Sequence, residues 1–198
     1  MRLFSLEHSE AAYRADFALY GAAIVLLAAY LLVASAHQPW LQGAALTLAG
    51  LASWTVIEYL LHRYILHGLA PFRDWHGEHH QRPMALISAP TILSAALIAT
   101  LVFLPALLAG GVYRASALTL GVLTGYLAFA ITHHAMHHWR ADSAWLARRK
   151  HWHALHHHAA QPACYGVTSA FWDHVFGSTG RARAALRQCA EPLAAPPR

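Results

Sequence analysis

Four groups of closely spaced histidines are the residues of this chain that could do chemistry. They follow the patterns H-x4-H, H-x2-H-H, H-x3-H and H-x2-H-H along the sequence. Neutral imidazole is the commonest metal ligand in proteins, so this many histidines in a chain of 198 residues indicate a site for more than one ion. The ten candidate metal-binding and catalytic residues are His62, His67, His76, His79, His80, His133, His137, His153, His156 and His157.

Helical geometry determines which of these histidines can reach one ion. Side chains three or four residues apart share a face of a helix, and the second, third and fourth groups each meet this condition. His62 and His67 are five residues apart, which is about 140° around an ideal helix. They therefore either bind two different ions or lie where the helix unwinds after Tyr64. Two ions also suit the number of donors, because ten nitrogens provide five for each ion.

The third group allows other assignments. His134 with His138, or His133 with His138, could serve in place of His133 with His137, which is the pair that we favour. The isolated histidines lack ligand spacing and are expected to be capped or surface residues: His8, His37 and His174.

Few carboxylates lie near the histidines. Glu58 falls about one turn inside an expected membrane segment, where an ionisable residue is costly and usually functional. Metal-bound histidines usually need a hydrogen-bond acceptor for the second ring nitrogen, so Glu58 could orient a ligand histidine. The other interpretation is a hydrogen bond to a neighbouring helix. Similar candidates are Asp74, Glu78 and Asp173.

The composition is typical of a membrane protein. Hydrophobic residues make up 57% of the chain and charged residues only 12%, against roughly 25% charged in soluble domains. The net charge of +5 could suggest nucleic acid, but the arginines form no stripe with interleaved aromatics, so we expect no nucleic-acid partner and a lipid bilayer instead. Two cysteines make no disulfide framework.

Four stretches are long and apolar enough to cross a membrane, which takes about 20 residues. They are residues 17–35, 41–61, 90–109 and 115–132. The predicted fold is an all-α integral membrane protein, with four transmembrane helices and a cytosolic helical cap that carries a histidine-rich dimetal site. Residues 1–198 are expected to form a single domain, with a disordered tail over 190–198.

The distribution of positive charge predicts the orientation. Residues 37–40 contain no Lys or Arg, and residues 110–114 contain only one of the 14 in the chain. Because short cytoplasmic loops collect Lys and Arg, both termini and all four histidine groups are predicted to be cytoplasmic.

Residues 141–158 are expected to form a helix on the membrane surface. Asp142 or Ser143 can cap its start. Apolar residues would then enter the interface while basic residues face lipid headgroups. The apolar set is Trp145, Leu146 and Trp152, and the basic set is Arg148, Arg149 and Lys150.

Nitrogen ligands alone do not define the metal, because imidazole suits zinc, copper, iron and nickel. Structural zinc would be satisfied by four ligands, usually including Cys. Ten histidines at one membrane face instead indicate two redox ions that activate dioxygen.

The four histidine groups, in this order, resemble those of the membrane fatty acid hydroxylase superfamily. This superfamily contains fatty acid 2-hydroxylases, sterol desaturases and carotenoid hydroxylases, and the fatty acid branch is the most similar. The resemblance extends from about Glu58 to Ser178 and is carried by residues 62–68, 76–83, 150–157 and 165–177.

The resemblance implies a di-iron site held by the ten histidines, with O2 as co-substrate and zinc able to replace iron in purified protein. No His-Pro-Gly-Gly haem motif occurs, so electrons would come from a separate reductase, ferredoxin or cytochrome. The expected reaction is hydroxylation of a fatty acyl chain of a membrane lipid. Gly121 and Gly125 could leave room for that chain, or could serve helix packing.

The sequence is also compatible with two other functions. One is a carotenoid or sterol hydroxylase or desaturase, because His133 and His138 followed by Trp139 resemble the carotenoid branch. The other is a membrane metal-binding or transport protein. Transport sites lie near the middle of the bilayer, whereas these histidines are predicted at one face.

Overall fold

The computed structural model describes residues 6–158 and 163–180, and the tail predicted over 190–198 lies outside them. Every regular element in this part of the chain is helical, with a single antiparallel bridge between Glu7 and Ile87. The α-helices are α1 (Glu10–Ala34), α2 (Trp40–Leu60), α3 (Phe72–Gln81), α4 (Thr91–Ile98), α5 (Leu104–His138), α6 (Ala144–His158) and α7 (Phe171–Val175). Two π-helices, η1 (Leu61–Leu66) and η2 (Ala99–Phe103), extend α2 and α4.

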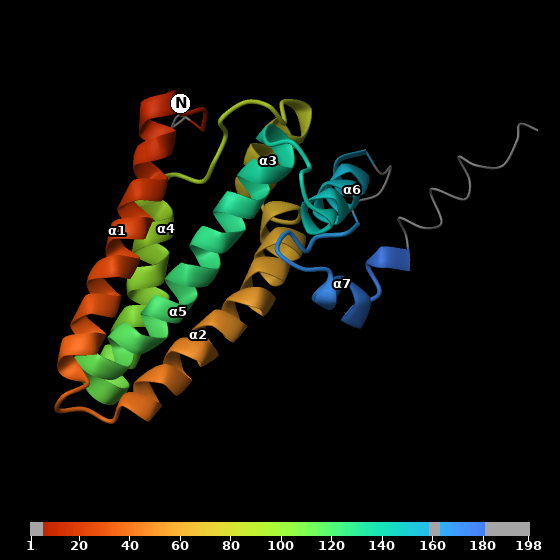
Figure 1. Cartoon of the computed structure of the whole chain (residues 1–198). Coiled ribbons are helices and arrows are strands. Elements are labelled where there is room, and N and C mark those ends of the chain that lie inside the picture. The colour runs from red at the N-terminus through yellow and green to blue at the C-terminus, as the bar shows by residue number, and fades with distance from the viewer. Residues whose placement is uncertain (1–5, 159–162, 181–198) are drawn as a thin grey trace, which may run out of the picture.

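Three helical stretches among the described residues are long and apolar enough to span a membrane: Glu10–Ala34, Trp40–Leu66 and Thr91–His138. The last one contains both segments that the sequence predicted separately over 90–109 and 115–132. Gly111 interrupts it with φ 79° and ψ 175°, a backbone conformation that glycine adopts without steric cost. Figure 1 shows the chain turning back there, so that α4 and the main part of α5 run in opposite directions.

Close packing of α2 against α5 forms the centre of the bundle. A Cβ atom on Gly121 would overlap the backbone of Thr47, and one on Gly125 would overlap the ring of Trp54. The Thr47 hydroxyl donates to the Ala117 carbonyl at 3.1 Å across the same contact. Small residues let helix backbones approach closely in membranes, so helix packing accounts for these two glycines.

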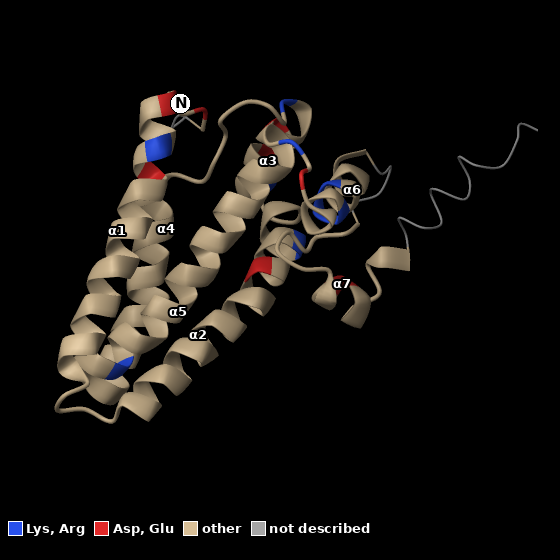
Figure 2. Ribbon diagram, viewed as in Figure 1, with Lys and Arg blue, Asp and Glu red and all other residues tan. Residues whose placement is uncertain are grey.

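The long helices present apolar side chains outward and carry little charge. Leu26 and Val33 on α1 are 70% and 77% exposed. Figure 2 shows that the charged residues lie mainly at one end of the bundle, where α3 and α6 lie. This distribution suits helices surrounded by lipid with one polar end.

Helix α6 lies across that polar end, and its start agrees with the predicted cap. The Ser143 hydroxyl oxygen accepts a hydrogen bond from the Leu146 backbone N–H at 3.2 Å. The surface placement was wrong for two residues, because α6 packs on α5 and on the segment that follows it. Leu146 is buried against Met136 and Val167, and Arg149 is only 5% exposed.

Candidate metal centre

The histidines converge in two groups at the polar end of the bundle. In each group, the potential ligand nitrogens all lie within 4.8 Å of one another. Helix α6 and helix α3 each contribute to both groups, while η1 contributes to the first and α5 to the second. The first group is His62, His67, His76 and His156, and the second group is His79, His133, His137 and His153.

The π-helix η1 brings His62 and His67 into the same group. A π-helix has i to i+5 hydrogen bonds, so residues five apart lie above one another as residues four apart do in an α-helix. Their ring centroids are 5.3 Å apart. The structure therefore places this pair in one group. The helix is already wider and less tightly wound from Leu61, whereas the sequence suggested unwinding after Tyr64.

His80 and His157 lie beside the two groups and connect them. The His80 Nε2 is 3.1 Å from the Nε2 atoms of both His76 and His156. The His157 Nε2 is 3.0 Å from that of His153. The rings of His80 and His157 stack with centroids 4.1 Å apart. All ten histidines selected from the sequence therefore lie together.

The alternative members of the third group lie on another face of α5. His134 and His138 stack on each other with centroids 4.4 Å apart, and His134 contacts the ring of Tyr13. The isolated His37 and His174 are exposed, as predicted. His8 is half-buried, and its Nε2 has no hydrogen-bond partner within the described part of the chain.

Two backbone carbonyls fix the tautomers of two first-group histidines. The Nδ1 of His62 donates to the Tyr165 carbonyl, and the Nδ1 of His156 donates to the Ala163 carbonyl at 2.7 Å. A carbonyl can only accept, so each Nδ1 carries the proton and each Nε2 has a free lone pair. This is the arrangement that metal-bound histidines usually show.

The segment that supplies these carbonyls is held by two buried carboxylates. Asp173 accepts from the backbone N–H groups of Tyr165 and Gly166, both at 2.8 Å, and from the Ser178 hydroxyl at 2.6 Å. Glu58 accepts from the Val167 and Thr168 N–H groups at 2.7 and 2.9 Å, and from the Thr168 hydroxyl at 2.7 Å. Sequence reasoning selected both acids as possible histidine partners.

Asp173 and Glu58 act on the histidines indirectly, because they hold residues 163–168 in place. We call the six residues 163–168 the carbonyl segment. The other two candidate acids lie near arginines instead, with Asp74 at 3.4 Å from Arg73 and Glu78 at 3.6 Å from Arg82.

Burial keeps the histidines neutral. It lowers the pKa of His67 to about 4 and that of His157 to about 3, because desolvation disfavours the charged imidazolium, with nearby histidines adding to the effect. Burial also lowers the pKa of His76, His79, His80, His153 and His156. At neutral pH these rings are therefore uncharged and keep lone pairs for a metal.

The nitrogen geometry fits metal ions. Imidazole nitrogens bind at about 2.0–2.1 Å, so neighbouring ligands at right angles around one ion lie about 3 Å apart. The Nε2 atoms of His62 and His76 are 3.0 Å apart, and those of His137 and His153 are 2.8 Å apart. Both ring nitrogens of His79 are buried and have no hydrogen-bond partner among the described residues, which is rare for polar atoms. An ion in the second group would bind one of them.

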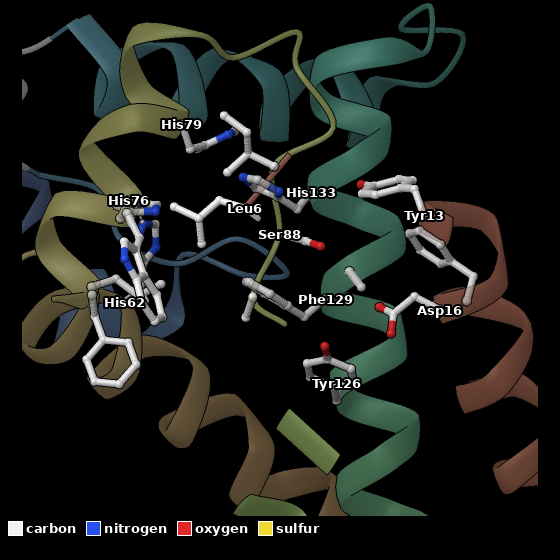
Figure 3. Close-up of a pocket in the computed structure, with 17 residues that line it drawn as sticks. Leu6, Tyr13, Asp16, His62, His76, His79, Ser88, Tyr126, Phe129 and His133 are labelled. Carbon is white, nitrogen blue, oxygen red and sulfur yellow. Dashed lines mark hydrogen bonds between the residues drawn. The ribbon is translucent and has the colours of Figure 1, made fainter. Parts of the chain in front are cut away.

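A largely apolar cavity of about 160 Å³ borders both histidine groups. His62, His76, His79 and His133 form part of its wall, as Figure 3 shows. Most of the other lining residues are apolar, among them Leu6, Leu66, Phe72, Ile87 and Phe129. A hydrocarbon chain in this cavity would lie directly against the histidines.

Fold and site together define a helical membrane-type protein with paired histidine clusters beside an apolar cavity. Residues 47–178 match the family described as fatty acid hydroxylase, and the chain belongs to that family. This confirms the resemblance that the sequence motifs indicated.

Characterised relatives and a solved structure agree with this assignment. The dihydroceramide fatty acyl 2-hydroxylase FAH2 of Arabidopsis thaliana is 35% identical over 150 residues, which cover 70% of this chain and 62% of that protein. The ceramide very long chain fatty acid hydroxylase scs7 of Schizosaccharomyces pombe is 33% identical, over 66% of this chain and 41% of its own length. A solved structure described as full-length scs7p, with only the hydroxylase domain visible, superposes with TM-score 0.67 and 28% identity, covering 79% of this chain and 63% of that one.

Proposed function

We propose that this protein is an O2-dependent di-iron hydroxylase that oxidises a fatty acyl chain of a membrane lipid. The observation that carries the proposal is the position of the two histidine groups in the wall of an apolar cavity. The names of the relatives, which are fatty acyl and ceramide hydroxylases, support an acyl substrate.

The ten histidines would hold two iron ions, with the first and second groups as the two sites and with His80 and His157 completing them. Zinc could take the place of iron in purified protein, because imidazole binds both. When bound, the iron pair supplies the reduction of O2 and the oxidation of a C–H bond, which side chains alone cannot perform. Electrons would come from a separate reductase, ferredoxin or cytochrome.

The side chains of the site would orient the metal-binding nitrogens and bind the hydrocarbon chain. His62 and His156 present deprotonated Nε2 atoms because their Nδ1 protons are held by carbonyls. Leu66, Phe72 and Phe129 would bind the hydrocarbon chain and exclude water from the histidines. This water exclusion protects a reactive centre from side reactions.

We also propose how the chain sits in the membrane. The four segments 17–35, 41–61, 90–109 and 115–132 would cross the bilayer, with the turn at Gly111 separating the last two. Both termini and the histidine groups would face the cytoplasm, because the charged residues gather at that end. Residues 1–198 would act as one domain.

Lipid analysis in cells tests the function. The chain is expressed with a competent electron donor, and lipids are profiled by mass spectrometry beside a His79→Ala variant and a His138→Ala control, which lies outside both groups. We expect a lipid species that gains one oxygen in wild type and in His138→Ala but not in His79→Ala. Oxidation of added carotenoid or sterol alone would overturn the acyl substrate. Metal flux without O2 consumption would overturn the enzyme.

A further inference from the structure

Helix α7 packs against the outer side of α2, within the predicted membrane segment. Figure 1 shows α7 beside the upper part of α2, on the side away from α1. The Trp172 indole N–H donates to the Thr55 hydroxyl at 3.0 Å. Thr55 lies six residues inside the end of the predicted segment 41–61, which is about 9 Å along a helix axis. Interfacial helices bury their apolar face about 5–10 Å into the boundary between headgroups and acyl chains, so α7 lies at the depth of such a helix.

The two sides of α7 differ in polarity. Asp173 is buried and accepts hydrogen bonds from the backbone of the carbonyl segment. Phe171 and Val175, which share the other face, are 61% and 56% exposed, and Phe176 directly after the helix is 47% exposed. An apolar patch of this kind marks a surface that another apolar phase or molecule covers. At the depth of α7 that phase is lipid.

A cation lies at the headgroup end of this apolar face. Arg63 on η1 is two residues beyond the end of the predicted segment 41–61. Tyr59 connects it to the end of α7, because the Arg63 Nη1 donates to the Tyr59 hydroxyl at 2.6 Å and the Phe176 ring stacks on the Tyr59 ring with centroids 5.3 Å apart. Positive charge and exposed apolar side chains therefore adjoin in the order in which a phospholipid presents its phosphate and its acyl chains.

Arg63 retains hydrogen-bonding capacity for an anion. A guanidinium has five N–H donors, and within residues 6–158 and 163–180 Arg63 donates to the Tyr59 hydroxyl and forms no ion pair with a carboxylate. Its central carbon lies 5.2–5.8 Å from the ring centroids of Tyr59, Tyr64 and Tyr165, and these rings restrict where the guanidinium can move. A fixed guanidinium suits phosphate, because two of its N–H groups match two phosphate oxygens.

We propose that η1 and α7 form a binding surface for an anionic phospholipid of the surrounding membrane. The lipid phosphate would accept hydrogen bonds from Arg63, and the acyl chains would pack on the exposed apolar side chains of α7 and on Phe176. None of these residues lines the cavity beside the histidines, so this lipid is distinct from the substrate. The inference goes beyond the proposed reaction and rests only on the proposed placement of α2 in the bilayer.

Photocrosslinking in liposomes tests this surface. The full chain is reconstituted in phosphatidylcholine with a trace of phosphatidylglycerol or of phosphatidylcholine that carries the same photoactivatable acyl chain, and mass spectrometry identifies the labelled residues. Both lipids should label residues 171–176, and phosphatidylglycerol should label them roughly fivefold more, which is the effect of one basic residue near a membrane surface. The exposed Leu26 and Val33 of α1 provide the internal standard.

Three variants separate charge from structure. Arg63→Gln should bring the ratio of the two lipids at α7 close to one, and Arg63→Lys should keep the preference for phosphatidylglycerol because the charge remains. Arg114→Gln is the matched control. It removes a cation that donates to Gln42 near the turn at Gly111 and should leave the ratio at α7 unchanged.

The outcomes distinguish the parts of the proposal. Labelling of α1 but not of residues 171–176 would overturn the lipid surface and would indicate that protein, for example a second copy of this chain, covers α7. Equal labelling of α7 by both lipids in wild type would overturn the role of Arg63, as would an unchanged ratio in an Arg63→Gln protein with normal labelling of α1. Absence of label on α1 and α2 as well would overturn the membrane placement and this surface with it.

Discussion

The two histidine groups have similar spacing but different support. In the first group, His62 and His156 each donate a hydrogen bond from Nδ1 to a backbone carbonyl of the carbonyl segment. In the second group, both ring nitrogens of His79 and the Nδ1 of the adjoining His157 are buried with no hydrogen-bond partner among residues 6–158 and 163–180. The first group is therefore organised before a metal arrives, while the second depends on the ion itself for its order.

Four imidazoles that converge therefore do not by themselves determine how tightly a site binds its metal ion. Partners of the outer ring nitrogen fix the tautomer and the orientation of the ring, and their loss commonly costs 10- to 100-fold in metal affinity. We therefore expect the first group to bind its ion more tightly and the second group to lose its ion first.

The largest expected effect comes from removing a ligand of the supported group. His156→Ala deletes a ligand nitrogen together with its link to Ala163, so metal affinity of the first group should fall at least a hundredfold and hydroxylation should be lost. Elemental analysis and lipid profiling measure the two effects. His138→Ala is the matched control, because that ring stacks on His134 outside both groups, and metal loss in this control would contradict the assignment.

The next largest effect is expected for a substitution that lowers the metal affinity of one histidine group and leaves all ten histidines in place. Asp173→Asn weakens the hydrogen bonds that hold Tyr165 and Gly166, so the first group should lose roughly 10- to 100-fold in affinity. Release of bound zinc to a chelator should show a fast and a slow phase in wild type.

The slow phase alone should accelerate in Asp173→Asn. Asp74→Asn, a surface substitution of the same type, serves as the control. Equal acceleration of both phases would indicate general loosening, and an unaltered slow phase would remove Asp173 from this role.

Acid should destabilise the metal-free protein, and a bound metal should oppose this. The pKa of His67 is lowered by burial from 6.5 to about 4, and that of His157 to about 3. Between these values and 6.5 the unfolded chain binds more protons than the folded one, so stability falls as the pH drops. The thermal midpoint of metal-free protein should be constant above about pH 6.5 and decline below it. A midpoint that rises on acidification would refute this account.

The smallest effect is expected for Glu58→Gln. A glutamine oxygen can still accept from the Val167 and Thr168 N–H groups, and the Thr168 hydroxyl can accept from the new amide. A loss of about 1 kcal/mol, or roughly fivefold in zinc affinity of the first group, is expected. Chelator competition measures the zinc affinity. Glu58→Ala should lower this affinity much further, because it leaves the Val167 and Thr168 N–H groups without an acceptor.

The helical fold and the convergence of the ten histidines could be predicted from the sequence, but the hydrogen bonds that hold their rings in place could not. The spacing of the histidines on a helix predicts which rings converge, because that geometry is local. The Ala163 and Tyr165 carbonyls carry no side-chain signal, so their contacts depend on the tertiary path of the carbonyl segment.

The face of helix α6 that packs on the protein could not be predicted from the sequence either, as Arg149 shows. A basic residue beside Arg148 and Lys150 indicates a headgroup contact, yet α6 turns Arg149 inward, where burial lowers its pKa while nearby Asp173 and Glu58 oppose that shift. The side of a short amphipathic helix that faces the protein is decided by the elements it packs against, which local sequence does not define.

The π-helix η1 has a consequence for how such sequences are interpreted. His133 and His137, four residues apart, share a group on a regular α-helix, while His62 on the π-helix η1 and His67, which directly follows η1, are five apart and share the other group. The number of residues between two ligands thus specifies the hydrogen-bond pattern of the backbone that carries them. Deleting one residue between His62 and His67 would preserve their alignment only if the whole turn reverted to α-helix, and the segment that leads to α3 would then rotate and shift relative to α2.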